Sequence, residues 1–173
     1  MRILEESEMQ HRMAAYCSSG ERCKQDVEKK LSTAGLSSDA CERILTRLIE
    51  ERFIDELRYT RSFINDKLRF NGWGRIRIKW ELKRKNIPQE IIFEAMRNMD
   101  EAAYITVLAD LLASKKKSLR GKDEKDVYIK LQRFAVGRGF EYDEITKCLL
   151  QLFDGRRYED NEDTSTGDYD KDI

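Results

Sequence analysis

The sequence predicts an all-α protein, built as an elongated, curved array of three tandem three-helix repeats. The main observation is a phrase that occurs three times with a period of roughly fifty residues: an apolar helix end, a Gly or Asn, a short polar stretch and a second apolar run. Gly35, Asn86 and Gly139 occupy equivalent places in the three copies. The composition agrees, because 38% charged residues and a single Pro favour exposed helices over a compact sandwich. A unit of this size buries little core alone, so the repeats are expected to stack.

The first copy of the phrase sets the expected helix ends. The stretch from Ser18 to Glu21 resembles a capping box that opens a second helix. Gly35 suits the left-handed residue just past the end of that helix. Ser37 or Ser38 can then cap the third helix. Applied along the chain, this pattern gives an N-terminal extension (1–8), repeats at 9–55, 56–100 and 101–153, and an acidic tail expected to be disordered (154–173).

The second copy contains the most ambiguous segment. From Ile76 to Leu82 apolar and charged residues alternate, which is typical of a β-strand. We nevertheless predict a helix, because Ile78 and Leu82 align with Val27 and Leu31 of the first copy. On a helix, the same alternation gives a broad apolar face beside a dense basic face.

Charge is distributed unevenly along the chain, although the formal net charge is zero. The tail (154–173) has eight acidic and three basic residues, so the preceding body carries 30 basic and 25 acidic residues. The chain start lacks a signal-peptide pattern, and no apolar run approaches the roughly 20 residues that span a bilayer. We therefore expect a cytoplasmic protein without a membrane segment. The four Cys match no zinc or redox spacing, so we expect small buried or half-buried residues and neither metal nor cofactor.

Two clusters of basic residues are the candidate binding sites. From Arg58 to Lys85, within the second repeat, only Asp66 and Glu81 oppose ten basic residues, and the third repeat has a basic loop from Ser114 to Lys122. Such clusters suit phosphates or an acidic protein surface, although solvated helix faces and solubilising loops look the same in sequence. Trp73, between two glycines, is a candidate exposed contact, whereas Trp80 is expected in the core. The candidates are Arg58, Arg61, Lys67, Arg69, Trp73, Arg75, Arg77, Lys79, Lys83, Arg84, Lys85, Lys115, Lys116, Lys117 and Arg120.

Spacing refines the basic second repeat. Arg75, Lys79 and Lys83 lie four residues apart, so on a helix they share one face. We expect this face to be the electrostatic footprint for phosphates. The acidic tail (154–173) carries the opposite charge. It is either inert or covers the basic repeat in the free protein and competes with phosphate.

The assembled phrases resemble the RecX family, bacterial regulators of the recombinase RecA. Phe53 to Glu56 resembles the family's apolar–acidic junction, Leu57 to Phe63 its aromatic short helix, and Arg69 to Arg77 its arginine–glycine turn into a basic helix. Leu82 to Ile87 resembles its helix end, with Asn in place of the usual Gly. The resemblance covers roughly Met9 to Phe153. It implies a curved helical array that binds the RecA–DNA filament and limits strand exchange, ATP hydrolysis and coprotease action. We expect such a protein to be a monomer.

Two other functions stay open. One is sequence-independent nucleic-acid binding without a recombinase partner, and the other is a helical adaptor for an unrelated acidic protein. An enzyme is not expected. His11 is the only histidine, Asp55 and Glu56 are adjacent and would point in different directions on a helix, and no phosphate-binding glycine loop is present.

Overall fold

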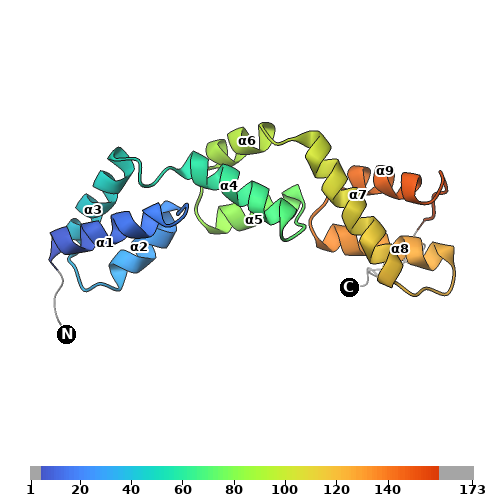
Figure 1. Cartoon of the computed structure of the whole chain (residues 1–173), viewed down its shortest axis with the longest axis horizontal. Helices are drawn as coiled ribbons and strands as arrows, with labels where there is room; N and C mark the ends of the chain where they lie inside the picture. The colour runs from blue at the N-terminus through green and yellow to red at the C-terminus, as the bar shows by residue number, and fades with distance from the viewer. Residues whose placement is uncertain (1–4, 160–173) are drawn as a thin grey trace, which may run out of the picture.

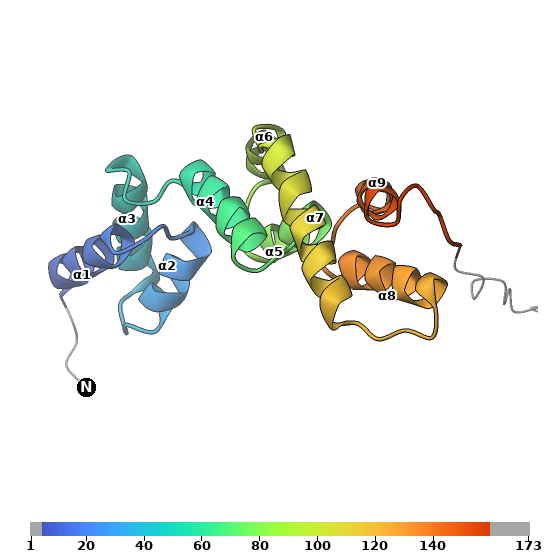
Figure 2. The same ribbon diagram turned by 45° about the vertical axis from the view of Figure 1, so that its right-hand side comes forward.

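The chain folds into helices arranged in three consecutive groups of three. The structure is a computed structural model that describes residues 5–159. In both Figure 1 and Figure 2 the middle group separates the other two along the long axis of an elongated array, and residues 5–159 contain no strand. The predicted all-α repeat array is therefore confirmed. The helices are α1 (Glu6–Ser18), α2 (Lys24–Ser32), α3 (Ser38–Glu50), α4 (Glu56–Arg69), α5 (Arg75–Arg84), α6 (Gln89–Arg97), α7 (Glu101–Ser118), α8 (Glu124–Gly137) and α9 (Tyr142–Leu152).

Left-handed residues follow the second helix of every group, as the repeated phrase predicts. The backbone angle φ is +77° at Gly35, +57° at Asn86 and +85° at Gly139. Ser37 is the N-cap of α3, and its hydroxyl accepts a hydrogen bond from the Ala40 N–H at 3.3 Å. The ambiguous segment that follows the second repeat's turn lies inside α5, so the helical interpretation is confirmed there as well.

Two local predictions are wrong. The segment from Ser18 to Glu21 does not open α2, which begins at Lys24 after the N-cap residue Cys23. Instead the Ser18 hydroxyl donates to the Ala14 carbonyl at 2.9 Å and closes the last turn of α1. The expected basic loop after Ser114 is helical as far as Ser118. Its three lysines therefore lie in the last turn of α7, where positive charge is favourable at the negative end of the helix dipole.

Apolar side chains form two separate cores. The first lies within the first group of helices and consists of Met9, Met13, Cys17, Val27, Leu31, Ile44, Leu45, Leu48 and Ile54. The second is continuous from the second group to the third, and includes Leu68, Ile78, Leu82, Tyr104, Leu108, Leu131 and Phe140. The last two repeats are therefore one packed unit, whereas the first repeat folds around a core of its own.

The junction between the first and second repeats is mostly polar. Arg58 pairs with Glu21 at 2.6 Å, and the Lys85 ammonium lies 3.0 Å from Asp26. Cys23 is the one residue of the first group that belongs to the second core, and it is fully buried. Burial, together with the neighbouring Asp26 carboxylate, raises the pKa of the Cys23 thiol to about 11. This junction therefore depends on charge pairs around a single small apolar contact.

The junction between the second and third repeats is made by the backbone. The Gly74 N–H donates to the Arg138 carbonyl at 2.9 Å, and the Ile76 N–H donates to the Gly139 carbonyl at 3.0 Å. A Cβ on Gly74 would lie 2.2 Å from the Gly139 oxygen, and a Cβ on Gly139 would lie 2.5 Å from the Arg77 nitrogen. Only residues without side chains allow the start of α5 to approach the end of α8 this closely.

The segment after α9 continues along the third repeat. The Tyr158 ring packs against Tyr128 and Phe153, with ring centroids 5.4 and 6.4 Å apart, and Arg156 pairs with Glu124 at 2.6 Å. Residues 154–159 of the expected disordered tail are thus placed against α8. The rest of that expectation, and the first half of the expected N-terminal extension (1–8), fall on residues 160–173 and 1–4, which lie outside the described residues. Glu6 to Glu8, which were expected in the extension, belong to α1.

Cysteine reactivity should follow this packing. Cys17, Cys23 and Cys148 are buried, and burial raises the pKa of each thiol, whereas Cys41 is partly exposed. We expect iodoacetamide at about pH 8 to alkylate Cys41 well before the other three, because the thiolate is the reactive form. Peptide mass spectrometry over time checks this order, and denaturant should make all four react alike. Early labelling of Cys23 in the native protein would contradict the buried first junction.

Candidate binding surface

Several predicted contact residues serve the fold instead. Arg58 and Lys85 hold the first junction through their carboxylate partners. Lys116 donates to the Leu152 carbonyl at the end of α9, at 3.2 Å, and its ammonium lies 4.0 Å from the centroid of the Phe153 ring. The charges of Arg58 and Lys85 are compensated inside the molecule, which contradicts their expected availability to a ligand. Lys116 keeps its charge, but its side chain is held against the end of α9.

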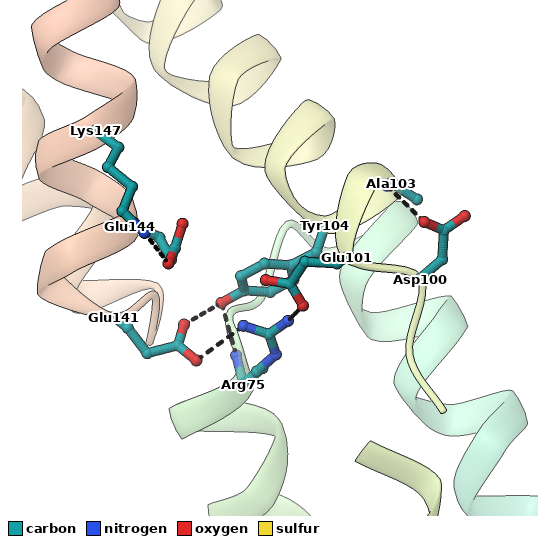
Figure 3. Close-up of polar contacts among 8 residues, drawn as sticks. All are labelled: Arg75, Asp100, Glu101, Ala103, Tyr104, Glu141, Glu144 and Lys147. Carbon is teal, nitrogen blue, oxygen red and sulfur yellow. Dashed lines mark hydrogen bonds and ion pairs between the residues drawn. The ribbon is translucent and has the colours of Figure 1, made fainter. Parts of the chain in front are cut away.

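Arg75 is also largely withdrawn from solvent, and Figure 3 shows its contacts with Glu101, Glu141 and Tyr104. Its side chain is 16% exposed, pairs with Glu101 and with Glu141 (3.2 Å), and lies 3.9 Å above the Tyr104 ring. Burial alone would lower the pKa of the Arg75 guanidinium, but the hydrogen bond and charge of Glu141 raise it above its ordinary value. The Tyr104 hydroxyl completes the network by donating to Glu141 and accepting from the Arg75 N–H. Arg75 therefore joins α5 to α7 and to the start of α9, and it does not share the predicted phosphate face.

The solvent side of α5 is both apolar and basic. Ile76 and Trp80 lie four residues apart, and each is 57% exposed. Lys79 and Lys83 are exposed and have no carboxylate partner within residues 5–159. Arg84 lies 4.7 Å from the Trp80 ring centroid and 3.7 Å from Glu81. We call Ile76, Lys79, Trp80, Lys83 and Arg84 the outward face of α5.

Helix geometry explains why the expected core position of Trp80 is wrong. The buried residues of α5 are Ile78 and Leu82, which are four apart and share one face. Trp80 is two positions from each, and two residues turn a helix by about 200°. Its ring therefore points to the solvent side, where Arg84 covers part of it.

A second set of cations is held by aromatic rings. Lys67 and Arg77 lie 5.0 and 4.2 Å from the centroid of the Trp73 ring. Lys115 and Arg138 lie 5.1 and 5.2 Å from the centroid of the Phe134 ring. Arg138 also donates to the Asn71 carbonyl at 2.7 Å, so the two groups meet at the backbone junction of the repeats. We call Lys67, Trp73, Arg77, Arg138, Phe134 and Lys115 the ring-ordered strip.

An aromatic ring and a carboxylate have different effects on the ability of a cationic side chain to bind an anion. A carboxylate cancels the positive charge, as at Arg58 and Lys85. An aromatic ring attracts the cation through its quadrupole but leaves its full charge uncompensated. The ring also restricts the side chain, so less conformational entropy is lost when an anion binds. The ring-ordered strip therefore presents pre-oriented positive charge, and Arg77 and Lys79 connect it to the outward face of α5.

The remaining candidates lie beside these surfaces or apart from them. Trp73 is half-buried on the core, so it holds cations and is not the free contact expected from its glycine neighbours. Arg61 pairs with Glu94 at 3.3 Å, and Arg69, Lys117 and Arg120 are exposed.

Sequence reasoning missed Phe134 and Arg138, although a signal for them was present. The two residues are four apart, which is the spacing at which an aromatic ring and a cation meet on a helix.

Residues 5–159 contain neither a metal-ligand cluster nor a membrane-spanning helix. No group of three or more His, Cys, Asp or Glu side chains is placed to hold a metal ion there. None of the helices in this range is long and apolar enough to cross a membrane.

The fold defines an all-α helical-repeat protein, which carries uncompensated cations on its second and third repeats. Residues 55–96 match the model of the second three-helix domain of RecX, and residues 104–149 match that of the third. The regulatory protein RecX of Prosthecochloris aestuarii is 31% identical over 142 residues, covering 82% of this chain and 91% of that protein. The chain therefore belongs to the RecX family, whose members are regulatory proteins and not enzymes.

Other members of the family agree in sequence and in fold. The regulatory protein RecX of Vibrio parahaemolyticus is 31% identical over 125 residues, which cover 72% of this chain and 78% of that protein. The crystal structure of RecX from Lactobacillus salivarius superposes with a TM-score of 0.76 at 21% identity, and covers 86% of this chain and 96% of that chain. A second RecX crystal structure gives a TM-score of 0.70 at 19% identity, with 87% and 74% covered.

Proposed function

We propose that this protein is a non-catalytic cytoplasmic regulator of the recombinase RecA. It binds the RecA–DNA filament and limits strand exchange, ATP hydrolysis and coprotease action, and so acts in DNA recombination, DNA repair and the SOS response. Membership of the RecX family supports the regulatory role. The main support for a contact with the filament is the ring-ordered strip. It crosses the junction between the second and third repeats, which share one core.

The geometry suits a repetitive, anionic target. Phosphate contacts need positive charge at fixed positions but no base recognition, so binding is independent of sequence. The second and third repeats hold Lys67, Arg77, Arg138 and Lys115 on one packed unit. We propose that this unit, within the plan of repeats at 9–55, 56–100 and 101–153, makes the main contacts. The protein binds as a monomer, with its long axis parallel to the filament.

A second candidate is nucleic-acid binding without a recombinase partner. The same strip favours it, because uncompensated cations bind phosphate whether or not RecA is present. The adaptor alternative draws its support from the outward face of α5, whose exposed Ile76 and Trp80 suit a protein surface.

The DNA-dependent ATPase of RecA separates these functions. We expect strong inhibition at ratios far below one molecule per RecA, because a filament regulator acts on many subunits at once. The control repeats the titration with the DNA concentration doubled. Inhibition that appears only when the protein saturates the DNA, and shifts with added DNA, would favour the second candidate. An unchanged ATPase at equimolar protein would favour the adaptor and reject our proposal.

A further inference from the structure

We propose that the acidic C-terminal segment, residues 160–173, docks on the outward face of α5 and the adjoining part of the ring-ordered strip, covering them in the free protein. The segment is then an intramolecular competitor of the anionic ligand. Only the identity of that anionic ligand rests on the proposed function. The surface itself is argued from position, reach and charge.

The described chain ends against the third repeat, next to the last turn of α8. Arg157 and Glu159 line the same groove as Val136, Gly137 and Tyr142. Val136 and Gly137 end α8 and directly precede the two residues whose carbonyl groups bond to the start of α5. The last described residue, Glu159, therefore lies on the repeat whose helix α8 contacts the start of α5.

The length of the segment is sufficient. Its fourteen residues span up to about 46 Å when extended, at about 3.3 Å per residue. Helix α5 has ten residues and is about 15 Å long. The segment can thus follow α5 along its whole solvent side without disturbing Tyr158, which packs on the third repeat.

Charge and polarity are complementary. Residues 160–173 contain six acidic residues and one Lys, whereas residues 1–159 contain 32 basic and 27 acidic residues. Lys79 and Lys83 offer uncompensated charge, and Ile76 and Trp80 lie exposed beside them on the same face. Tyr169 and Ile173 supply apolar side chains within the acidic segment. This combination favours an acidic, partly apolar peptide.

A second copy of the protein is a poorer occupant of the same face. A symmetric contact would bring the lysines of two α5 helices together, and like charges placed opposite one another are unfavourable. We therefore assign the surface to the chain's own acidic segment.

Quenching of Trp80 fluorescence by acrylamide tests coverage directly. In a Trp73→Phe background, Trp80 is the only tryptophan. Three versions of this protein are compared in the absence of DNA. They are the full-length chain, the chain truncated after Glu159, and the full-length chain with the six acidic residues of 160–173 changed to the corresponding amides. We expect both altered versions to lose the protection of Trp80 seen in the full-length chain. At about 1 M salt, where the Debye length is about 3 Å, the difference should disappear. The matched variant Lys79→Glu with Lys83→Glu should also lose the protection.

DNA affinity gives a second readout, in proteins that retain Trp73. Truncation after Glu159 should tighten DNA binding about tenfold at about 20 mM salt, and much less at high salt. Equal quenching and equal low-salt affinity in the full-length and truncated proteins would overturn the proposal. Protection that depends on protein concentration would also overturn it, in favour of a second copy. Tighter DNA binding after truncation, combined with an unchanged RecA ATPase, would keep this inference and reject the proposed function.

Discussion

Gly74→Ala is expected to separate the second and third repeats and to lower the free energy of unfolding by about 4 kcal/mol or more. The added Cβ would lie 2.2 to 2.3 Å from backbone atoms of Gly139 and Phe140, which no side-chain rotation can relieve. The hydrogen bond from the Gly74 N–H to the Arg138 carbonyl would break as the start of α5 moves away from the end of α8. Because the two repeats share one core, the damage extends well beyond the turn. Urea denaturation followed by circular dichroism measures the loss.

Gly137→Ala is the matched control. Gly137 ends α8, and a Cβ at this position would meet no atom within 4 Å. Alanine there should be neutral or should stabilise the protein by up to about 1 kcal/mol, because glycine loses more backbone entropy in a helix. Similar unfolding curves for the Gly74 and Gly137 variants would show that the close backbone contact does not hold the repeats together.

Neutralising one cation on each ring of the ring-ordered strip should weaken DNA binding strongly. The variant is Arg77→Gln with Lys115→Gln, since within residues 5–159 each of these cations meets an aromatic ring and no carboxylate, so that their loss leaves no carboxylate unpaired. We expect affinity to fall at least about tenfold at low salt, and the slope of log affinity against log salt to become shallower by about 1.4 to 1.8. Fluorescence anisotropy with a labelled oligonucleotide at several salt concentrations measures both quantities.

The control for this variant makes the same change in net charge elsewhere. Lys24 and Lys147 are exposed and paired with Glu28 and Glu144, outside the strip. Lys24→Gln with Lys147→Gln should leave the salt slope almost unchanged, because those charges are already compensated. Equal losses in the two double variants would mean that net charge, and not the strip, determines binding.

The helical scaffold could be predicted because its determinants are local and repeated. The left-handed region favours Gly and Asn over most other residues, so the phrase ending at Gly35, Asn86 and Gly139 marks the same turn three times. The alignment also decided the helix at α5, where alternation alone favours a strand. In α5 the apolar residues alternate with charged ones, so their spacing alone does not show which side of the helix is buried. The buried side follows only once Ile78 and Leu82 are identified as the buried pair. For this reason Ile78 and Leu82 were placed correctly and Trp80 was not.

The candidate site was harder to predict, because the fate of a cation depends on distant residues. Arg75 and Arg77 are two positions apart and look equivalent in sequence. Contacts with Glu101 and Glu141 from the third repeat neutralise Arg75, whereas the nearby Trp73 ring holds Arg77 and leaves its charge free. Composition counts both as positive charge. Only the packing of the third repeat against the second distinguishes the structural cation from the available one.

The division into two cores also determines the order in which the chain can fold as it leaves the ribosome. The first core is complete within the first 54 residues, so the first repeat can become compact as soon as Ile54 leaves the ribosome. The second repeat cannot complete its packing at that stage, because Ile78 and Leu82 belong to a cluster that includes Leu131 and Phe140. Its apolar surface stays exposed until most of the third repeat has been made. Translation speed between these two points therefore sets how long the nascent chain is open to aggregation or to chaperone binding.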